Sequence, residues 1–414
     1  MIKQAAGVRF IFITLVLDVL GMGIVIPIMP ELIGTFVGGH ISNASWWYGG
    51  IIAVYAAMQF LFAPALGRLS DRYGRRPILL IALAGASLDY LLLALAPNLA
   101  WLVIGRIIAG ITGASMSVGV AYIADVTTPE RRTQNFGIVG AAFGIGLVLG
   151  PIVGGLLGGF GPQVPFYAAA LLTGLNWLYG LLVLPESLAP AHRRPFEWRQ
   201  ANPFGTLGLL GRYPGVRGLT AIFLLINLTQ QSLHSTWVLS TIHRFGWTSI
   251  DNGIALAVYG IVTAAVQTVL LRALLPRLGS RRVIVVGLVS YIVGFAGFAF
   301  AQAGWMMYAA LVASCLCFLT QPAIQGLISA QAGADSQGAI QGALTSLVSL
   351  TSVIGPLIST GVFSTFTSAT APVHFPGAPF VLGAGFCVIG LLLALHRPLP
   401  SVGGVRTPPI ISQH

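Results

Sequence analysis

Charged side chains are scarce in this sequence. Only 7% of the 414 residues are Asp, Glu, Lys or Arg, whereas 56% are hydrophobic, and the mean hydropathy is +0.87. A water-soluble globule needs far more polar side-chain area to cover its surface, so this composition excludes that class of protein. We therefore expect an integral membrane protein.

Cysteines are few, and nucleotide-binding motifs are missing. Cys315, Cys317 and Cys387 all lie in apolar segments, which argues against a disulfide framework and against a metal site. The phosphate-binding pattern Gly-x-x-x-x-Gly-Lys-Ser/Thr does not occur, so direct coupling to ATP is not expected. The sequence therefore predicts a protein that is not an enzyme and that holds no cofactor.

Long apolar runs are what the sequence has in abundance. A helix needs about 20 residues to cross roughly 30 Å of hydrocarbon. Runs of this length predict an all-α membrane protein with twelve transmembrane helices. The predicted spans are 8–30, 46–66, 77–96, 99–123, 134–158, 164–184, 216–242, 251–274, 283–302, 305–329, 337–362 and 378–396.

One offset of about 205 residues relates several landmarks in the two halves of the chain. The landmarks are Gly137 with Gly342, Gly150 with Gly355, Pro151 with Pro356, and the basic turn 67–76 with the shorter turn 276–282. Such duplication is typical of transporters built from two membrane-embedded halves. We expect two pseudo-symmetric six-helix bundles at 1–185 and 216–397. A cytoplasmic linker is expected at 186–215 and a flexible tail at 398–414.

Basic residues cluster in alternate connections between the spans. They lie at 67–76, 131–132, 193–217 and 277–282, whereas the intervening connections hold almost no basic residue except Arg244. Positive charge in short loops stays on the cytoplasmic side, so both termini are expected in the cytoplasm. The expected location of the protein is the bacterial inner membrane. This topology accounts for the net charge of +11, and no nucleic-acid partner is needed to explain it.

Three ionisable residues fall inside predicted spans, where a charge costs about 2.5–3.5 kcal/mol on insertion scales. Asp18 lies near the middle of the first span, and desolvation there disfavours its charged form, as a proton carrier requires. Asp89 and Arg106 lie about eight or nine residues either side of a turn near 97–98, so a hairpin brings them to one depth. We predict that Asp18, Asp89 and Arg106 take part in proton coupling. For Asp18, the alternative is an aspartate that is only hydrogen-bonded to neighbouring helices; for Asp89, it is a purely structural pair with Arg106.

Neutral polar side chains take the place of acids in the second half, where no Asp or Glu occurs between Asp251 and Asp335. Those of the seventh span recur every three or four residues, which places them along one face of a helix. We expect them to line a substrate cavity; hydrogen bonding between helices is the alternative. The predicted cavity residues are Tyr55, Gln59, Asn227, Gln230, Gln231, His234, Gln267 and Gln325.

Glycines crowd the fifth span around a proline. They are Gly144, Gly146, Gly150, Gly154 and Gly155, and the proline is Pro151. Small residues let another helix approach closely, and proline permits bending. The pattern favours a helix at a moving seam, and ordinary close packing is the alternative.

These motifs together resemble the major facilitator superfamily. The turn 67–77 is similar to the loop between that family's second and third helices, Arg106 to its fourth-helix arginine, and 146–155 to its fifth-helix signature of exporters. The resemblance implies a charge cluster at the cytoplasmic face that latches one conformation and releases another. The gating residues implied in this way are Gly67, Asp71, Gly74, Arg75, Asp125, Arg131 or Arg132, Gly146, Gly150 and Pro151.

Within that superfamily the chain resembles the tetracycline/proton antiporters. The similarity is carried by segments 17–30, 55–59, 85–90, 244–247, 322–326 and 337–342. Such exporters also use an acidic residue in the ninth helix and a histidine in the eighth, where this sequence has Tyr291 and Thr263.

The residues and the resemblance together predict a proton-coupled secondary exporter of small, largely apolar organic compounds, similar to tetracycline, that works by alternating access. Its expected partners are a small-molecule substrate, protons and the lipid bilayer, and we expect a monomer. A proton-coupled nutrient importer of the same fold is the main alternative. A membrane receptor or scaffold that transports nothing is the third.

Overall fold

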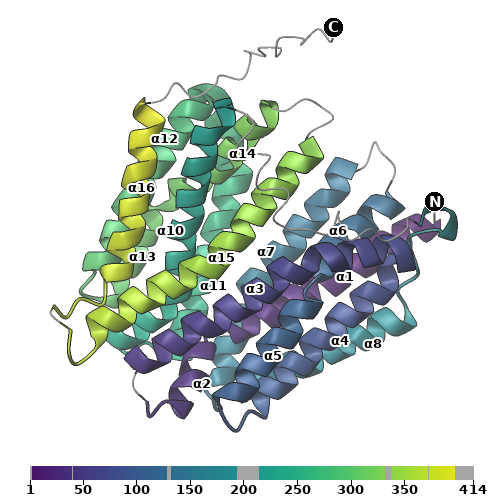
Figure 1. Ribbon diagram of the computed structural model, residues 1–414, viewed down its shortest axis with the longest axis horizontal. Helices are drawn as coiled ribbons and strands as arrows, with labels where there is room; N and C mark the ends of the chain where they lie inside the picture. Colours follow the sequence, from purple (N-terminus) through teal and green to yellow (C-terminus); the bar gives the residue numbers. More distant parts are fainter. Residues whose placement is uncertain are drawn as a thin grey trace, which may run out of the picture.

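The computed structural model describes residues 2–39, 41–127, 132–193, 214–331, 337–371 and 373–396, and the regular structure in these ranges is helical (Figure 1). The first half holds α1 (Ile2–Val25), α2 (Met29–Phe36), α3 (Ile41–Tyr73), α4 (Arg75–Ala94), α5 (Leu99–Thr112), α6 (Ser115–Val126), α7 (Arg132–Gly158), α8 (Val164–Leu182) and the short η2 (Pro190–His192). The second half holds α10 (Pro214–Phe245), α11 (Ser249–Ala265), η4 (Val266–Leu270), α12 (Leu271–Phe300), α13 (Gly304–Ala313), η5 (Cys315–Leu319), α14 (Thr320–Ala330), α15 (Gln337–Thr367) and α16 (Ala378–His396).

Each of the twelve predicted spans coincides with one helix or with consecutive helical pieces. Among the described residues, eight helices are long and apolar enough to cross a membrane, or ten if each bent pair counts as one span. The bent pairs are α1 with α2, at 44°, and α13 with the helical segment that follows it, at 41°. Pro27 lies in the first of these breaks.

The predicted sixth and seventh spans correspond to α8 and α10, which are not among those ten because polar residues lower their hydropathy. In α8 the side chains of Thr173 and Asn176 are fully buried. The Asn176 amide Nδ2 donates a hydrogen bond of 2.9 Å to the carbonyl oxygen of Thr14 in α1. A polar group buried between helices is tolerated when it is paired in this way.

The two halves form two helical bundles that meet along two helix pairs, α3 with α15 and α7 with α11 (Figure 1). The internal repeat explains this arrangement, because Pro151 lies inside α7 and its counterpart Pro356 lies inside α15. Each half therefore offers the equivalent helix to the other. Most of the predicted linker, the predicted tail and Arg131 lie outside the described residues.

The contacts between bundles gather at one end of the molecule, which we call the closed end. Ser364 near the end of α15 donates a hydrogen bond of 2.9 Å to the carbonyl oxygen of Ser42 at the start of α3. Ser249 at the start of α11 donates one of 3.2 Å to the carbonyl oxygen of Gly155 near the end of α7. The basic turn 67–76 lies at the other end of α3, which we call the basic end. In Figure 1, α3 and α15 are close at the closed end and diverge from it.

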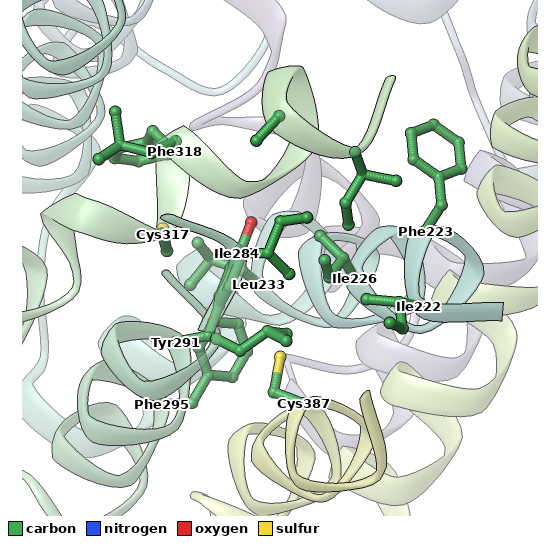
Figure 2. Packing of buried hydrophobic residues seen from close by; sticks show 14 of the residues in the cluster. Ile222, Phe223, Ile226, Leu233, Ile284, Tyr291, Phe295, Cys317, Phe318 and Cys387 are labelled. Atoms are coloured by element: carbon green, nitrogen blue, oxygen red, sulfur yellow. The ribbon is translucent and has the colours of Figure 1, made fainter. Parts of the chain in front are cut away.

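Each bundle has an apolar core of its own. The core of the second bundle includes Tyr291 and Phe295 of α12, Cys317 of η5 and Cys387 of α16, which Figure 2 shows around α10. A further cluster joins the bundles at the closed end, since Leu239 of α10 and Phe363 of α15 pack with residues of the first half. Among the described residues, the apolar cluster that the two bundles share therefore lies at the closed end.

Arg244, the exception to the charge pattern of the sequence, stabilises the end of α12. Its guanidinium donates hydrogen bonds of 2.6 Å to the carbonyl oxygen of Phe298 and 3.2 Å to that of Ala299, and a third to that of Ala301. The last carbonyls of a helix lack partners within the helix and carry a partial negative charge. A structural role therefore accounts for this basic residue.

Candidate functional site

A cavity of about 720 Å³ lies between the two bundles and is lined by residues of both. The first bundle contributes residues of α1, α3, α4, α5, α6 and α7, and the second contributes residues of α10, α11, η4, η5 and α14. The cavity residues and coupling residues of the sequence prediction that line it are Asp18, Tyr55, Asp89, Arg106, Gln230, His234 and Gln267. The cavity is large enough for a drug-sized molecule.

Asp18 is 5% exposed and lines the cavity from the second half of α1. Its carboxylate accepts a hydrogen bond of 2.6 Å from the hydroxyl of Ser115, the first residue of α6. The backbone around it is held closely against α7, since a Cβ added at Gly146 would lie 2.7 Å from the Cβ of Val19. The carboxylate is therefore fixed in position at the edge of the cavity.

Asp89 of α4 and Arg106 of α5 form the ion pair that the hairpin geometry predicts. The Arg106 Nε donates a hydrogen bond of 3.1 Å to Oδ1 of Asp89, and its Nη2 donates a second one to Oδ2. The guanidinium carbon lies 5.6 Å from the ring centre of Tyr55 and 5.8 Å from that of Tyr90. The pair is thus bidentate, and aromatic rings with which a cation interacts favourably are close to it.

The second bundle faces the cavity with neutral polar and aromatic groups. Gln230 donates a hydrogen bond of 2.9 Å from its amide to the hydroxyl of Tyr291, and the ring of His234 lies 3.5 Å from the hydroxyl of Tyr259. Both glutamine and histidine line the cavity. Thr263, which stands where related exporters are expected to have a histidine, lines it too.

Half of the predicted cavity residues lie elsewhere among the described residues, so the stripe on α10 does not face one cavity. Asn227 donates to the carbonyl oxygen of Phe223 in its own helix (2.8 Å), and Gln231 donates to the hydroxyl of Ser352 in α15 (2.7 Å). These two residues form local and interhelical hydrogen bonds, which was the alternative. Gln59 and Gln325 also do not line the cavity.

Gln59 remains close to the site through a different contact. Its amide donates a hydrogen bond of 3.2 Å to the carbonyl oxygen of Gly113, which lines the cavity. Gly113 lies at the break between α5 and α6. Gln59 therefore supports the wall of the cavity from behind.

Several lining residues escaped the sequence prediction. They are Tyr48, Tyr90, Ser115, Trp237 and Tyr259. Aromatic residues are common in apolar helices and give no signal of which face they occupy. Ser115 had a signal that was available, because it follows Gly113 in the fourth predicted span, where a break exposes backbone groups.

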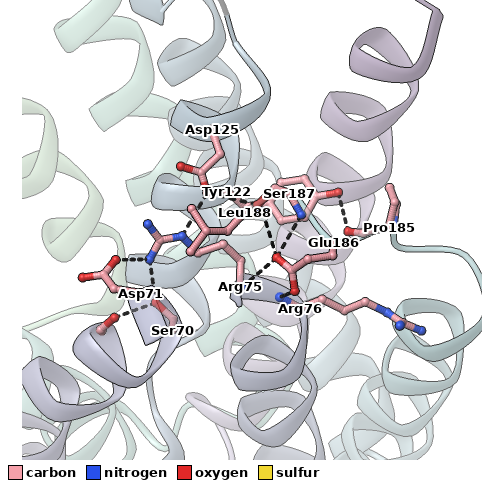
Figure 3. Close-up of polar contacts among 11 residues, drawn as sticks. Ser70, Asp71, Arg75, Arg76, Tyr122, Asp125, Pro185, Glu186, Ser187 and Leu188 are labelled. Carbon is pink, nitrogen blue, oxygen red and sulfur yellow. Dashed lines mark hydrogen bonds and ion pairs between the residues drawn. The ribbon is translucent and has the colours of Figure 1, made fainter. Parts of the chain in front are cut away.

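The basic turn forms a charge cluster inside the first bundle (Figure 3). Arg75 lies between two carboxylates, with its Nη1 2.5 Å from Oδ1 of Asp71 and its Nε 2.9 Å from Oδ2 of Asp125. The Arg75 Nη1 also donates to the hydroxyl of Ser70 (2.7 Å), which in turn donates to the carbonyl oxygen of Gly67 (2.6 Å). The cluster connects the end of α3, the start of α4 and the end of α6.

Glu186 completes this cluster and was not predicted. Its carboxylate accepts hydrogen bonds from the backbone nitrogens of Arg75 (2.9 Å) and Arg76 (3.2 Å), at the start of α4 (Figure 3). A negative charge is favourable at the N-terminus of a helix. Gly74 has a φ of 110°, and a side chain there would collide with this carboxylate. The first residue of the predicted linker is therefore docked onto the first bundle.

Helix α7 contacts α1 within its bundle and α11 across the seam. A Cβ added at Gly150 would lie 2.6 Å from the Cα of Gly23 in α1. A Cβ at Gly253 of α11 would collide with the carbonyl oxygen of Pro151. The glycines and proline of the fifth predicted span thus allow two helices to approach α7 at backbone distance.

Comparisons with known proteins agree with this architecture. Residues 11–356 match the family described as the Major Facilitator Superfamily. The chain is 40% identical to the class C tetracycline resistance protein of Escherichia coli over 384 residues, covering 93% of this chain and 95% of that protein. It is 34% identical to the class B tetracycline resistance protein of Escherichia coli, covering 97% and 98%.

Solved structures show the same fold. A bacterial homologue of the human lysosomal transporter Spinster, solved in an inward-facing and unoccupied conformation, has a TM-score of 0.78 and 16% sequence identity to this chain. The alignment covers 95% of this chain and 96% of that one.

Proposed function

This chain belongs to the Major Facilitator Superfamily, and from that premise we propose that it is a proton-coupled exporter of small, largely apolar organic compounds. It is a membrane transporter rather than an enzyme. The observation that carries the proposal is a cavity that residues of both bundles line, Asp18 among them. Secondary transporters bind substrate and coupling ion at such an interface between repeats.

Asp18 is the group proposed to carry the proton. Its side chain is buried at the cavity wall and bonded to the uncharged Ser115. When water fills the cavity, it favours release of the proton; when the cavity closes, the loss of water favours the neutral carboxyl. Asp18 can therefore change charge as the bundles move.

Asp89 and Arg106 are proposed to keep a fixed charge pair beside this group. Their ion pair neutralises both charges in the interior, and the Arg106 side chain is 14% exposed. The pair can therefore adjust the electrostatic environment of Asp18 without itself carrying a proton through the cycle. This is a positioning role for both residues.

The cavity chemistry suits an aromatic, polyfunctional substrate. Tyr55, Tyr90, Trp237 and Tyr259 offer flat apolar surfaces, and amides such as Gln230 offer hydrogen-bond donors and acceptors. The relatives are tetracycline resistance proteins, so we propose a compound of that chemical kind as substrate.

The direction of transport follows from the orientation. We propose that the basic end lies in the cytoplasm and that the protein acts as a monomer; the closed end then faces outward, which corresponds to an inward-facing state. Substrate then enters the cavity from the cytoplasm, and protons enter from outside after the closed end opens. The basic-end cluster around Arg75 is proposed to act as the latch of the opposite state.

Transport in proteoliposomes with an imposed pH gradient tests the proposal. We expect accumulation of a tetracycline against its concentration gradient in the wild type and none with Asp18→Asn. Glu31→Gln is the matched control, because this exposed carboxylate of α2 is not among the cavity-lining residues. Uptake that does not depend on the pH gradient contradicts proton coupling. A fully active Asp18→Asn variant contradicts a role of Asp18 in the mechanism.

A further inference from the structure

The fourth predicted span is interrupted beside the proposed proton site. Helix α5 ends at Thr112 and α6 begins at Ser115. Gly113 has φ −71° and ψ 64°, and the nitrogen of Ala114 donates to the carbonyl oxygen of Thr112 at 2.8 Å. These are the values of an inverse γ-turn, which ends one helical segment and lets a second begin at a different angle.

The break places the start of α6 next to Asp18. The hydroxyl of Ser115 donates to Oδ2 of Asp18 at 2.6 Å, within the range of hydrogen bonds to a charged acceptor. The residue that precedes α6, Ala114, supplies no side-chain cap. The start of a helix carries a partial positive charge, so the Asp18 carboxylate lies where a negative charge is favoured.

Building on the proposed function, we propose that Ser115 is a positioning residue that sets the pH at which Asp18 exchanges its proton. The hydroxyl stabilises the ionised carboxylate through a charge-assisted hydrogen bond. When Asp18 accepts a proton from water, the carboxyl becomes neutral and the same hydrogen bond loses its charge assistance. Hydrogen bonds to charged groups contribute more than those between neutral groups, so Ser115 favours the deprotonated state selectively.

The turn itself holds Ser115 in this position. Gln59 of α3 donates a hydrogen bond of 3.2 Å to the carbonyl oxygen of Gly113. A Cβ at Gly113 would lie 2.9 Å from the carbonyl oxygen of Ala109, so a larger residue strains the turn. The position of the Ser115 hydroxyl relative to Asp18 therefore depends on the shape of the break.

The test compares Ser115→Ala with Ser115→Thr, which keeps the hydroxyl. In proteoliposomes, we expect the pH of half-maximal transport to rise by about one unit in the alanine variant and to return close to the wild-type value with threonine. Ser117→Ala is the matched control, because Ser117 lies in the same turn of α6 but donates to the carbonyl oxygen of Ala114. A structural role alone lowers the transport rate without moving this pH.

A second readout does not depend on transport. The infrared band of the protonated Asp18 carboxyl, identified by its loss in Asp18→Asn, is followed against pH in detergent-solubilised protein. We expect its midpoint to rise in Ser115→Ala and to stay unchanged in Ser117→Ala. An unchanged midpoint in Ser115→Ala overturns the role of Ser115.

The two readouts separate this role from the proposed function. A shifted infrared midpoint in a protein that ignores the pH gradient supports Ser115 while removing proton-coupled export. Transport that the pH gradient drives, with an unmoved infrared midpoint in Ser115→Ala, supports proton-coupled export and overturns the role of Ser115. If Ser115→Ala does not insert into the membrane, Ser115→Cys replaces it, because a thiol has nearly the same size and is a weak donor.

Discussion

Removing Arg106 is expected to destabilise the protein more than removing both members of its ion pair. The Asp89 side chain is 2% exposed and that of Arg106 is 14% exposed, so neither charge is well solvated. Breaking a buried ion pair by deleting one partner costs about 3–5 kcal/mol, because it leaves an unpaired charge. Arg106 lines the cavity, so we expect water to solvate part of the remaining charge and the cost of Arg106→Gln to be about 2–3 kcal/mol.

The double variant Asp89→Asn/Arg106→Gln removes both charges and leaves two amides that hydrogen-bond to each other. We expect it to regain most of the lost stability, and the exchanged pair Asp89→Arg/Arg106→Asp to regain part of it. The free energy of unfolding in mixed detergent micelles measures both. Transport by the double variant then separates the two readings of Asp89: activity near the wild-type value assigns the pair to structure, and its loss assigns it to coupling.

Two results contradict this reasoning. If Arg106→Gln is as stable as the wild type, the pair does not hold the α4–α5 hairpin. If the exchanged pair is less stable than either single variant, the rings of Tyr55 and Tyr90 rather than Asp89 determine the position of the guanidinium.

Three further substitutions test helix packing and the hydrogen bonds at helix ends. Gly150→Val forces α1 and α7 apart, since even a Cβ would lie 2.6 Å from the Cα of Gly23. We expect less monodisperse protein after detergent extraction than for the control Gly140→Val, whose added Cβ meets nothing within 4 Å. Glu186→Gln weakens the cap of α4, and we expect a loss of about 1 kcal/mol in the free energy of unfolding; an unchanged value shows that the carboxylate charge is not needed there. Arg244→Ala leaves carbonyls of α12 without a partner, and we expect a loss of about 2 kcal/mol in the same measurement, with an unchanged thermal midpoint as the contrary result.

The helices and the repeat were predictable because the membrane allows few solutions. Each span must be a helix of about 20 mostly apolar residues, so long apolar runs locate the spans, including α8 and α10, whose polar residues lower the mean hydropathy. The pairing of Asp89 with Arg106 was predictable too, since a tight hairpin fixes the depth of both residues. These predictions needed only distances along the chain.

The orientation of α10 was not predictable at the same level. Adjacent helical residues are about 100° apart, so Gln230 and Gln231 point in different directions even though both belong to one polar stripe. Packing against α12 and α15 decides which of them reaches the cavity: Gln230 bonds Tyr291, and Gln231 bonds Ser352. A pattern of three and four residues identifies a stripe without saying which edge of it faces the substrate.

Glu186 was missed for a different reason. It follows Pro185 in a polar segment that was predicted to be a linker, and its partners on α4 are backbone nitrogens more than one hundred residues earlier. Backbone donors leave no trace in a sequence. Only the position of α4 beside the end of α8 brings them together.

Helix α7 provides a direct physical connection between the proposed proton site and the seam. Its Gly146 is packed against Val19, the neighbour of Asp18, and Pro151, about 1.4 turns later, is packed against Gly253 of α11. Contacts at backbone distance cannot absorb a shift by a change of rotamer, so we predict that any displacement of α1 on proton exchange is passed to α7 as a whole. The closed end, where α7 meets α11, is then the place at which that displacement changes the contact between the bundles. We therefore predict that the same glycines that permit close packing also serve a moving seam.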